Sequence, residues 1–168
     1  MKSFERITKE QVISYLPPGF DKYQFAYRCK RSVDDAISIL NHETLKHLER
    51  NKSYVRILFV DFSSAFNTIV PSRLYLKVHK IVIPTYLCDW ILDFLTSRTQ
   101  YVKMGDKFSE TISIDIGSPQ GWVLSAILFT LYTNDLKVVS KEESGCLIIK
   151  FADDTTLVGL IKDGDEEN

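Results

Sequence analysis

The chain has few of the residues that build disulfide or zinc sites. Its three cysteines, Cys29, Cys88 and Cys146, lie far apart, and its three histidines are equally scattered. The absence of any Cys-x-x-Cys pair or Cys/His cluster argues against a zinc site. Three distant thiols are typical of a reduced protein, so we expect an intracellular location, in the cytoplasm or the nucleus.

Long apolar runs are also lacking. The longest apolar stretch, from Trp122 to Tyr132, is interrupted by Ser125 and Thr130. It is far shorter than the roughly 20 residues that span a bilayer. The first residues lack the apolar segment of a signal peptide. We therefore expect no membrane partner.

The net charge of −1 does not indicate nucleic-acid binding by itself, but the charges are unevenly distributed. Residues 1–60 hold 11 Lys and Arg against 7 Asp and Glu, whereas residues 141–168 hold 3 against 8. The basic N-terminal third is a weak indication of phosphate binding, because a solvated helix face gives the same pattern. The 168 residues, 45% of them hydrophobic, are enough for one domain with a real core.

The patterning mixes helices with strands that pair locally. Helices are expected at 4–16, from the capping-box-like Ser32 to about Arg50, at 72–80, at 84–97 and from the 117–121 loop to about Asn134. A hairpin is expected around Gly105-Asp106, and a second one around Asp153-Asp154. The run 54–62 is apolar on both faces, which predicts a central strand buried on both sides. This order favours an α+β fold, an antiparallel sheet with helices on one face.

Three aspartates follow apolar, β-rich runs. Asp61 follows residues 56–60, and the pair Asp153 and Asp154 follows residues 146–152. Ionised carboxylates at the ends of buried strands are costly unless a cation lies between them. Three such carboxylates predict a divalent-cation site with oxygen ligands suited to Mg²⁺. Taken singly, each aspartate is also compatible with a turn or a helix cap.

Three segments combine into a more specific pattern. They are residues 59–66 (FVDFSSAF), 117–125 (GSPQGWVLS) and 151–155 (FADDT). In this order and spacing they resemble motifs A, B and C of the reverse-transcriptase palm, in particular that of non-LTR (LINE-type) retrotransposons. The resemblance extends through residues 24–28 (QFAYR), 90–95 (WILDFL) and 128–135 (LFTLYTND), and so covers nearly the whole chain.

The resemblance implies an RNA-directed DNA polymerase that adds dNTPs to a DNA primer on an RNA template. It implies Asp61, Asp153 and Asp154 as catalytic residues. Asp61, Asp153 and the backbone carbonyl of Phe62 would hold two Mg²⁺ ions, for which Mn²⁺ is a possible substitute. Two such ions serve in-line displacement at phosphorus. The oligomeric state is left open.

The resemblance also implies residues around the nucleotide. Phe66 would be a steric gate against ribose, although an aromatic residue five positions after Asp61 is also compatible with a core position. Gln120 and Gly121 would contact the nascent base pair. The adjoining Gly117, Ser118 and Pro119 would contact template and primer. Taken alone, these loop residues are compatible with an ordinary helix N-terminal loop.

Arg28 and Arg31 are further candidates for nucleotide binding, since a guanidinium suits triphosphate oxygens. A solvated basic turn is an equal alternative for them.

The resemblance implies a polymerase palm with an RRM/ferredoxin-like core. We expect one partial reverse transcriptase domain over 1–168, with a fingers portion at 1–52 and the palm at 53–168, and with thumb and endonuclease absent. The main alternative is an inactive retroelement remnant that at most binds nucleic acid, since Trp122 and Ala126 depart from the family pattern. A small two-metal phosphohydrolase is a weaker one, because it leaves Phe66 and the 117–121 loop unexplained.

Overall fold

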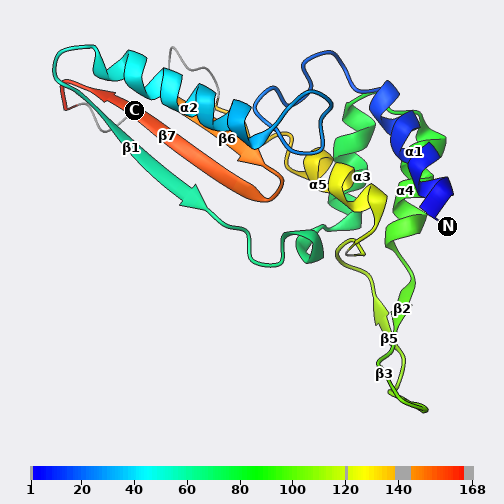
Figure 1. The fold of residues 1–168 in the computed structure, drawn as a ribbon. Coiled ribbons are helices and arrows are strands. Elements are labelled where there is room, and N and C mark those ends of the chain that lie inside the picture. Colours follow the sequence, from blue (N-terminus) through cyan, green and yellow to red (C-terminus); the bar gives the residue numbers. More distant parts are fainter. Residues whose placement is uncertain (1, 120, 139–144, 165–168) are drawn as a thin grey trace. The chain divides into compact units, whose positions relative to one another are not determined.

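The computed structural model describes residues 2–119, 121–138 and 145–164. It consists of two compact units that interleave along the sequence (Figure 1). The first comprises Met1–Phe20 and Ser64–Tyr132, and the second comprises Asp21–Ser63 and Thr133–Asn168. The expected division into a fingers portion at 1–52 and a palm at 53–168 is defined by function and not by compactness, so it stays a prediction.

The described part of the first unit is mainly helical. Its elements are α1 (Lys2–Ser14), a 3-10 helix (Ala65–Thr68), α3 (Pro71–Lys80), α4 (Thr85–Leu95) and α5 (Val123–Tyr132). Helix α5 packs on α1 and α3 and is buried over most of its length. It can be buried on nearly every side because its sequence, VLSAILFTLY, is apolar all round. Its first backbone amide, that of Val123, donates to the buried carboxylate of Glu5, an anion where the helix dipole favours one.

Two short strand pairs complete the first unit. Strand β2 (Arg98–Gln100) pairs with β5 (Ile112–Ile114), and β3 (Lys103–Met104) pairs with β4 (Lys107–Phe108). The predicted turn at Gly105-Asp106 is confirmed, because these two residues connect β3 to β4. The partner of residues 112–114 differs from the expectation: they pair with β2 and not with residues 101–104.

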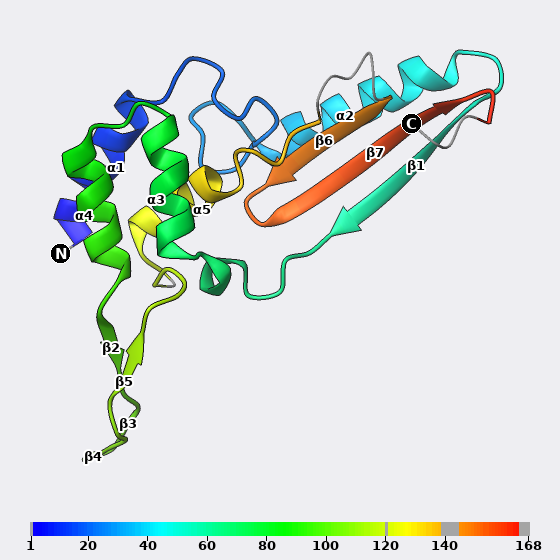
Figure 2. The same cartoon turned by 180° about the vertical axis from the view of Figure 1, so that it is seen from behind.

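The second unit is an antiparallel sheet with one helix against it. Its strands are β1 (Ser53–Val60), β6 (Cys146–Phe151) and β7 (Asp154–Lys162), in the spatial order β1-β7-β6. Helix α2 (Val33–Leu48) contacts β1 and β6 and lies along the sheet, as Figure 2 shows from behind. The helix begins at the predicted capping box between Ser32 and Asp35. A small core lies between helix and sheet, with Phe25, Ala36, Leu147, Ile149 and Val158 buried.

The expectation that residues 54–62 form a central strand buried on both sides is wrong. Within the described residues, β1 pairs with β7 alone and so lies at the edge of the sheet. Leu58 and Phe59 are 58% and 73% exposed. An apolar run shows that a strand has two apolar faces, but it does not supply a second layer to cover them.

No helix in the described ranges has the length and apolar character needed to cross a membrane.

Candidate functional site

The carboxylates of interest gather at one end of the sheet in the second unit. Strand β1 ends at Val60, which pairs with Thr155 of β7, so Asp61 follows at the end where β7 begins. Asp154 is the first residue of β7 and pairs with Phe151, the last residue of β6. The turn between β6 and β7 therefore consists of Ala152 and Asp153. The predicted strand-end placement of Asp61 and Asp153 is confirmed at the level of the backbone.

The side chains at this sheet end are accessible. Asp61 and Asp154 are exposed, and Asp153 is half-buried. Within the described ranges no hydrogen bond or ion pair occupies the three carboxylates. In the same ranges no three His, Cys, Asp or Glu side chains converge closely enough to hold a metal ion. Shared coordination of a metal by Asp61 and Asp153 therefore stays a prediction.

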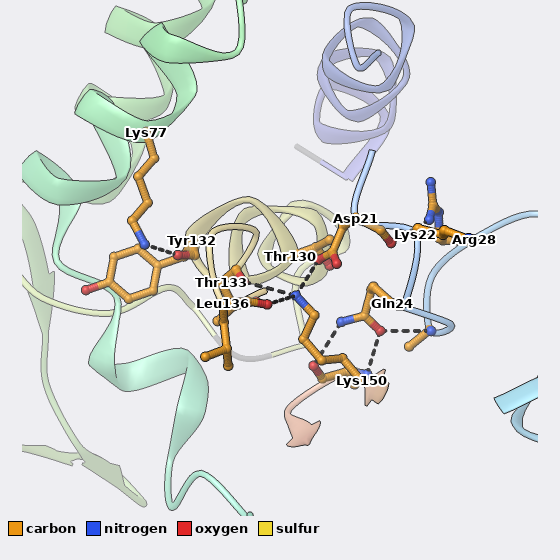
Figure 3. Close-up of polar contacts among 12 residues, drawn as sticks. Asp21, Lys22, Gln24, Arg28, Lys77, Thr130, Tyr132, Thr133, Leu136 and Lys150 are labelled. Carbon is orange, nitrogen blue, oxygen red and sulfur yellow. Dashed lines mark hydrogen bonds and ion pairs between the residues drawn. The ribbon is translucent and has the colours of Figure 1, made fainter. Parts of the chain in front are cut away.

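The turn that carries Asp153 is held by the buried amide of Gln24, which Figure 3 labels with its hydrogen bonds as dashed lines. The side chain of Gln24 is fully buried and bonds to both backbone polar groups of Ala152. Ala152 adopts a φ of +58°, a left-handed conformation that is unfavourable for a residue with a Cβ. Gln24 was not predicted as a site residue, although it begins the 24–28 segment through which the family resemblance extends.

Tyr27 is a second neighbour of this end of the sheet. Burial and, to a smaller extent, the Asp153 carboxylate raise the pKa of its phenol. The ring is 47% exposed, so it is accessible to a ligand. Its backbone also has a positive φ, +58°. A tyrosine in a basic, aromatic segment carries no signal in the sequence that would place it near a particular aspartate.

The two candidate arginines are engaged with the backbone of their own segment. Arg28 donates to the carbonyl of Asp21 at 2.8 Å, and Arg31 donates to the carbonyl of Lys22 at 2.5 Å. The Arg31 guanidinium also lies 4.9 Å from the centre of the Phe25 ring. Burial, followed by the charge of Arg31, lowers the pKa of Arg28. These contacts favour local structural roles, and triphosphate binding by either arginine stays a prediction.

The 117–121 loop belongs to the first unit and is braced by its own chain. The backbone amides of Gly117 and Ser118 donate to the carbonyls of Ile69 and Phe66. Gly117 has a φ of +82°, and a Cβ there would come within 2.8 Å of the Asn67 backbone. This glycine therefore allows two segments of the same chain, at Gly117 and Asn67, to lie close together.

The remaining described residues of the loop differ in how many contacts hold them. The Ser118 hydroxyl donates to that of Ser125, which in turn donates to the carbonyl of Pro119. Gly121 is exposed, with open space where a Cβ would lie. Gln120 lies outside the described residues. Trp122 packs on Phe94, with ring centres 5.4 Å apart.

Phe66 is partly buried against the core of the first unit. Its ring centre lies 5.4 Å from that of Phe129, which is itself buried. This packing fits the alternative of a core aromatic given for Phe66. The residue follows a left-handed Ser64 and lies in the 3-10 helix, which turns the ring toward α5. Its contact with a nucleotide stays a prediction.

Comparison with known proteins decides the family. Residues 1–163 match the family described as reverse transcriptase (RNA-dependent DNA polymerase). The chain belongs to the reverse transcriptase family. The resemblance seen in the sequence is thereby confirmed.

Its similar relatives include polymerases of Drosophila mobile elements. The reverse transcriptase chain is 28% identical over 163 residues to the RNA-directed DNA polymerase from mobile element jockey of Drosophila melanogaster, which covers 94% of this chain and 18% of the relative. It is 26% identical over 156 residues to the probable RNA-directed DNA polymerase from transposon X-element of the same species, covering 91% and 17%. The chain thus spans less than a fifth of the length of these two relatives.

A solved structure supports the fold. Telomerase from Candida tropicalis, determined in complex with a TWJ fragment of telomeric RNA, superposes with a TM-score of 0.67. The likeness covers 94% of this chain and 28% of the telomerase chain at 12% identity, so it shows a shared fold alone. The predicted α+β class is confirmed.

Proposed function

We propose that this reverse transcriptase chain carries the polymerase centre of an RNA-directed DNA polymerase of a LINE-type element. Its substrates are dNTPs, and its partners are an RNA template and a DNA primer. The observation that carries the proposal is the placement of Asp61, Asp153 and Asp154 at one end of the β1-β7-β6 sheet, in a chain that matches the family from residue 1 to 163. We infer an intracellular site of action.

The donor set at this sheet end suits Mg²⁺. Carboxylates supply the hard oxygen ligands that this cation prefers, and within the described ranges no hydrogen bond or ion pair occupies those of the three aspartates. Asp61, Asp153 and the carbonyl of Phe62 would hold the ions, and Asp154 would support them from the start of β7. When bound there, the ions would supply positive charge against the reacting phosphate and would favour ionisation of a coordinated hydroxyl.

The chain's own residues position the reactants. The primer 3′-oxygen attacks the α-phosphorus of the dNTP, the new P–O bond forms, and pyrophosphate leaves with the electrons of the broken bond. This reaction needs alignment and charge neutralisation more than covalent catalysis. Asp61 and Asp153, on neighbouring sheet elements, would fix the alignment. Phe66 would exclude ribose, Gly117 to Gly121 would support the base pair and template, and Arg28 and Arg31 would approach the triphosphate.

A primer-extension assay tests the proposal. The purified chain is given a primed RNA template, dNTPs and Mg²⁺ or Mn²⁺. We expect incorporation that falls by at least about 10²-fold in Asp153→Asn, the loss seen when one preorganised electrostatic group is removed from a transition state. Asp106→Asn, an exposed aspartate in the β3–β4 turn, is the matched control and should leave the rate unchanged.

The alternative is a remnant that binds nucleic acid without catalysis. One pair of results favours it. The folded chain would bind a primed template in a filter-binding assay but incorporate no nucleotide in the primer-extension assay. Equal activity of the original chain and Asp153→Asn would refute the role of the aspartates outright.

A further inference from the structure

The side chain of Gln24, labelled in Figure 3, makes three hydrogen bonds, two of them to Ala152 in the turn that carries Asp153 and one to Ala26. Its Nε2 donates to the carbonyl of Ala152 at 3.2 Å. Its Oε1 accepts from the backbone amides of Ala152 and Ala26, each at 3.0 Å. Gln24 is 0% exposed, so no water competes for these bonds. A buried amide that satisfies three otherwise unpaired backbone groups is costly to remove.

The backbone around Gln24 is fastened to the same place. Residue 24 forms a parallel bridge with Lys150 at the end of β6. The Lys150 amide donates to the carbonyl of Tyr23 at 2.8 Å, and the Phe25 amide donates to the carbonyl of Lys150 at 2.9 Å. We call residues 23–27 the clamp segment. The clamp segment adds a single parallel bridge alongside β6. It ends at Tyr27, whose phenol interacts electrostatically with Asp153.

The bonds of Gln24 fix the orientation of a particular peptide plane. The carbonyl of Ala152 and the amide of Asp153 belong to one planar unit. Fixing the amide and the carbonyl of Ala152 therefore sets φ and ψ of that residue, including its unfavourable φ of +58°. This plane fixes the position of the Asp153 Cα, and the φ of Asp153 then sets the direction of its Cβ. A turn of two residues leaves little other freedom through which its carboxylate could be redirected.

We propose that Gln24 is a positioning residue that holds the Ala152-Asp153 turn so that the Asp153 carboxylate faces the metal and nucleotide. The proposal rests on the proposed function for the role of Asp153, but the holding of the turn is independent of it. A purely structural role, in which Gln24 only satisfies buried backbone groups, predicts a loss of overall stability without a specific effect on cation binding.

Two measurements on the chain separate these roles. The first is hydrogen exchange of individual amides by NMR. In Gln24→Met, which keeps the side-chain length and removes the bonds, the amides of Ala152 and Ala26 should exchange about tenfold faster. Amides of the β1–β7 ladder should keep their rates. Gln24→Glu retains an acceptor for both amides, so exchange of Ala152 should be slower in it than in Gln24→Met.

The second measurement is the affinity for Mn²⁺, followed by electron paramagnetic resonance without nucleic acid or nucleotide. Gln24→Met should weaken Mn²⁺ binding by about 10-fold or more, as for other residues that orient a metal ligand. His47→Leu is the matched control. Its Nε2 bonds to the carbonyl of Ile161 near the opposite end of β7, so its loss removes a comparable bond without touching the turn. It should leave Mn²⁺ affinity and Ala152 exchange unchanged.

The outcomes are distinct. Fast Ala152 exchange with unchanged Mn²⁺ affinity in Gln24→Met overturns the positioning role, as does a uniform acceleration of all amides. If Gln24→Met fails to fold, the comparison rests on Gln24→Glu, which keeps the acceptor for the two amides and loses the donor to the Ala152 carbonyl. Its added negative charge would by itself strengthen cation binding. Faster Ala152 exchange with weaker Mn²⁺ binding in Gln24→Glu therefore supports the proposal, and weaker binding without faster exchange counts against it. If the original chain does not bind Mn²⁺, the proposed function fails, while the exchange rates still decide whether Gln24 holds the turn.

Discussion

Lys150 and Asp21 form a buried ion pair, with 2.7 Å between Nζ and Oδ2 and side chains that are 2% and 3% exposed. The Lys150 ammonium also donates to the carbonyls of Thr133 and Leu136 (Figure 3). Burial lowers the pKa of Lys150 and raises that of Asp21, and the pairing opposes both shifts. Lys150, near the end of β6, thus contacts both residues 133–136 after α5 and Asp21, which precedes the clamp segment.

Breaking this ion pair should be strongly destabilising. Lys150→Met leaves the Asp21 carboxylate buried and unpaired, so the free energy of unfolding should fall by about 3–5 kcal/mol. The double variant Lys150→Met/Asp21→Asn should recover part of this loss, because no buried charge remains. Urea unfolding of the chain measures both values.

The exposed pair of Lys162 and Asp163 provides the control. Its atoms are 3.7 Å apart and both side chains are more than half exposed. Lys162→Met should therefore change the free energy of unfolding by less than about 1 kcal/mol. Similar effects of Lys150→Met and Lys162→Met would contradict the importance of burial.

The pKa of Tyr27 should report its proximity to Asp153. Burial and the Asp153 charge place this pKa above the ordinary value of 10.0. In Asp153→Asn the charge is removed and burial remains, so the pKa should decrease but stay above the ordinary value. An NMR titration of ¹³C-labelled tyrosine, with Tyr27→Phe for assignment, measures it.

The same shift has a consequence for stability. Because the folded-state pKa of Tyr27 is raised, its contribution to stability is present below pH 10 and is lost as the pH rises through the folded-state value. Tyr27→Phe should weaken this alkaline loss. An identical Tyr27 titration in the original chain and Asp153→Asn would place the two side chains apart.

Phe66→Ala should change sugar selectivity in an active enzyme. A smaller side chain leaves room for the ribose 2′-hydroxyl, so incorporation of ribonucleotides relative to deoxynucleotides should rise by about 10-fold or more. The variant also loses the contact with Phe129, so its unfolding should be measured in parallel. Phe108→Ala, which truncates an exposed ring in β4, should leave selectivity unaltered. Unchanged selectivity in Phe66→Ala would leave this residue with a core role alone.

Ala152→Gly should stabilise the β6–β7 turn. Glycine adopts the observed φ of +58° without the steric penalty of a Cβ, and the bonds to Gln24 involve only the backbone of residue 152. We expect the free energy of unfolding to rise by up to about 1 kcal/mol. Ala36→Gly, in the first turn of α2, should lower it by a similar amount or more. A loss of stability in Ala152→Gly would show that the alanine side chain contributes packing that outweighs the strain.

Local patterns in the sequence were enough to predict the family, the α+β class and most helices. The capping box at Ser32 and the Gly105-Asp106 turn are short-range signals, and both are confirmed. The strand-end positions of Asp61, Asp153 and Asp154 were also predictable, because each follows an apolar β-rich run. Such patterns predict the local structure correctly because each depends only on residues a few positions apart.

Only the tertiary structure decided which faces are covered and which distant groups meet. The run 54–62 has the composition of a central strand, yet β1 is an edge strand among the described residues, because an apolar face does not determine its own partner. The sequence is compatible with Phe66 as a gate or as a core residue. Its contact with Phe129 depends on the turn of the chain at Ser64. The bonds of Gln24 to Ala152 join residues 128 positions apart. No local pattern encodes them, since they arise only when the sheet has formed and its last turn needs partners for a buried backbone.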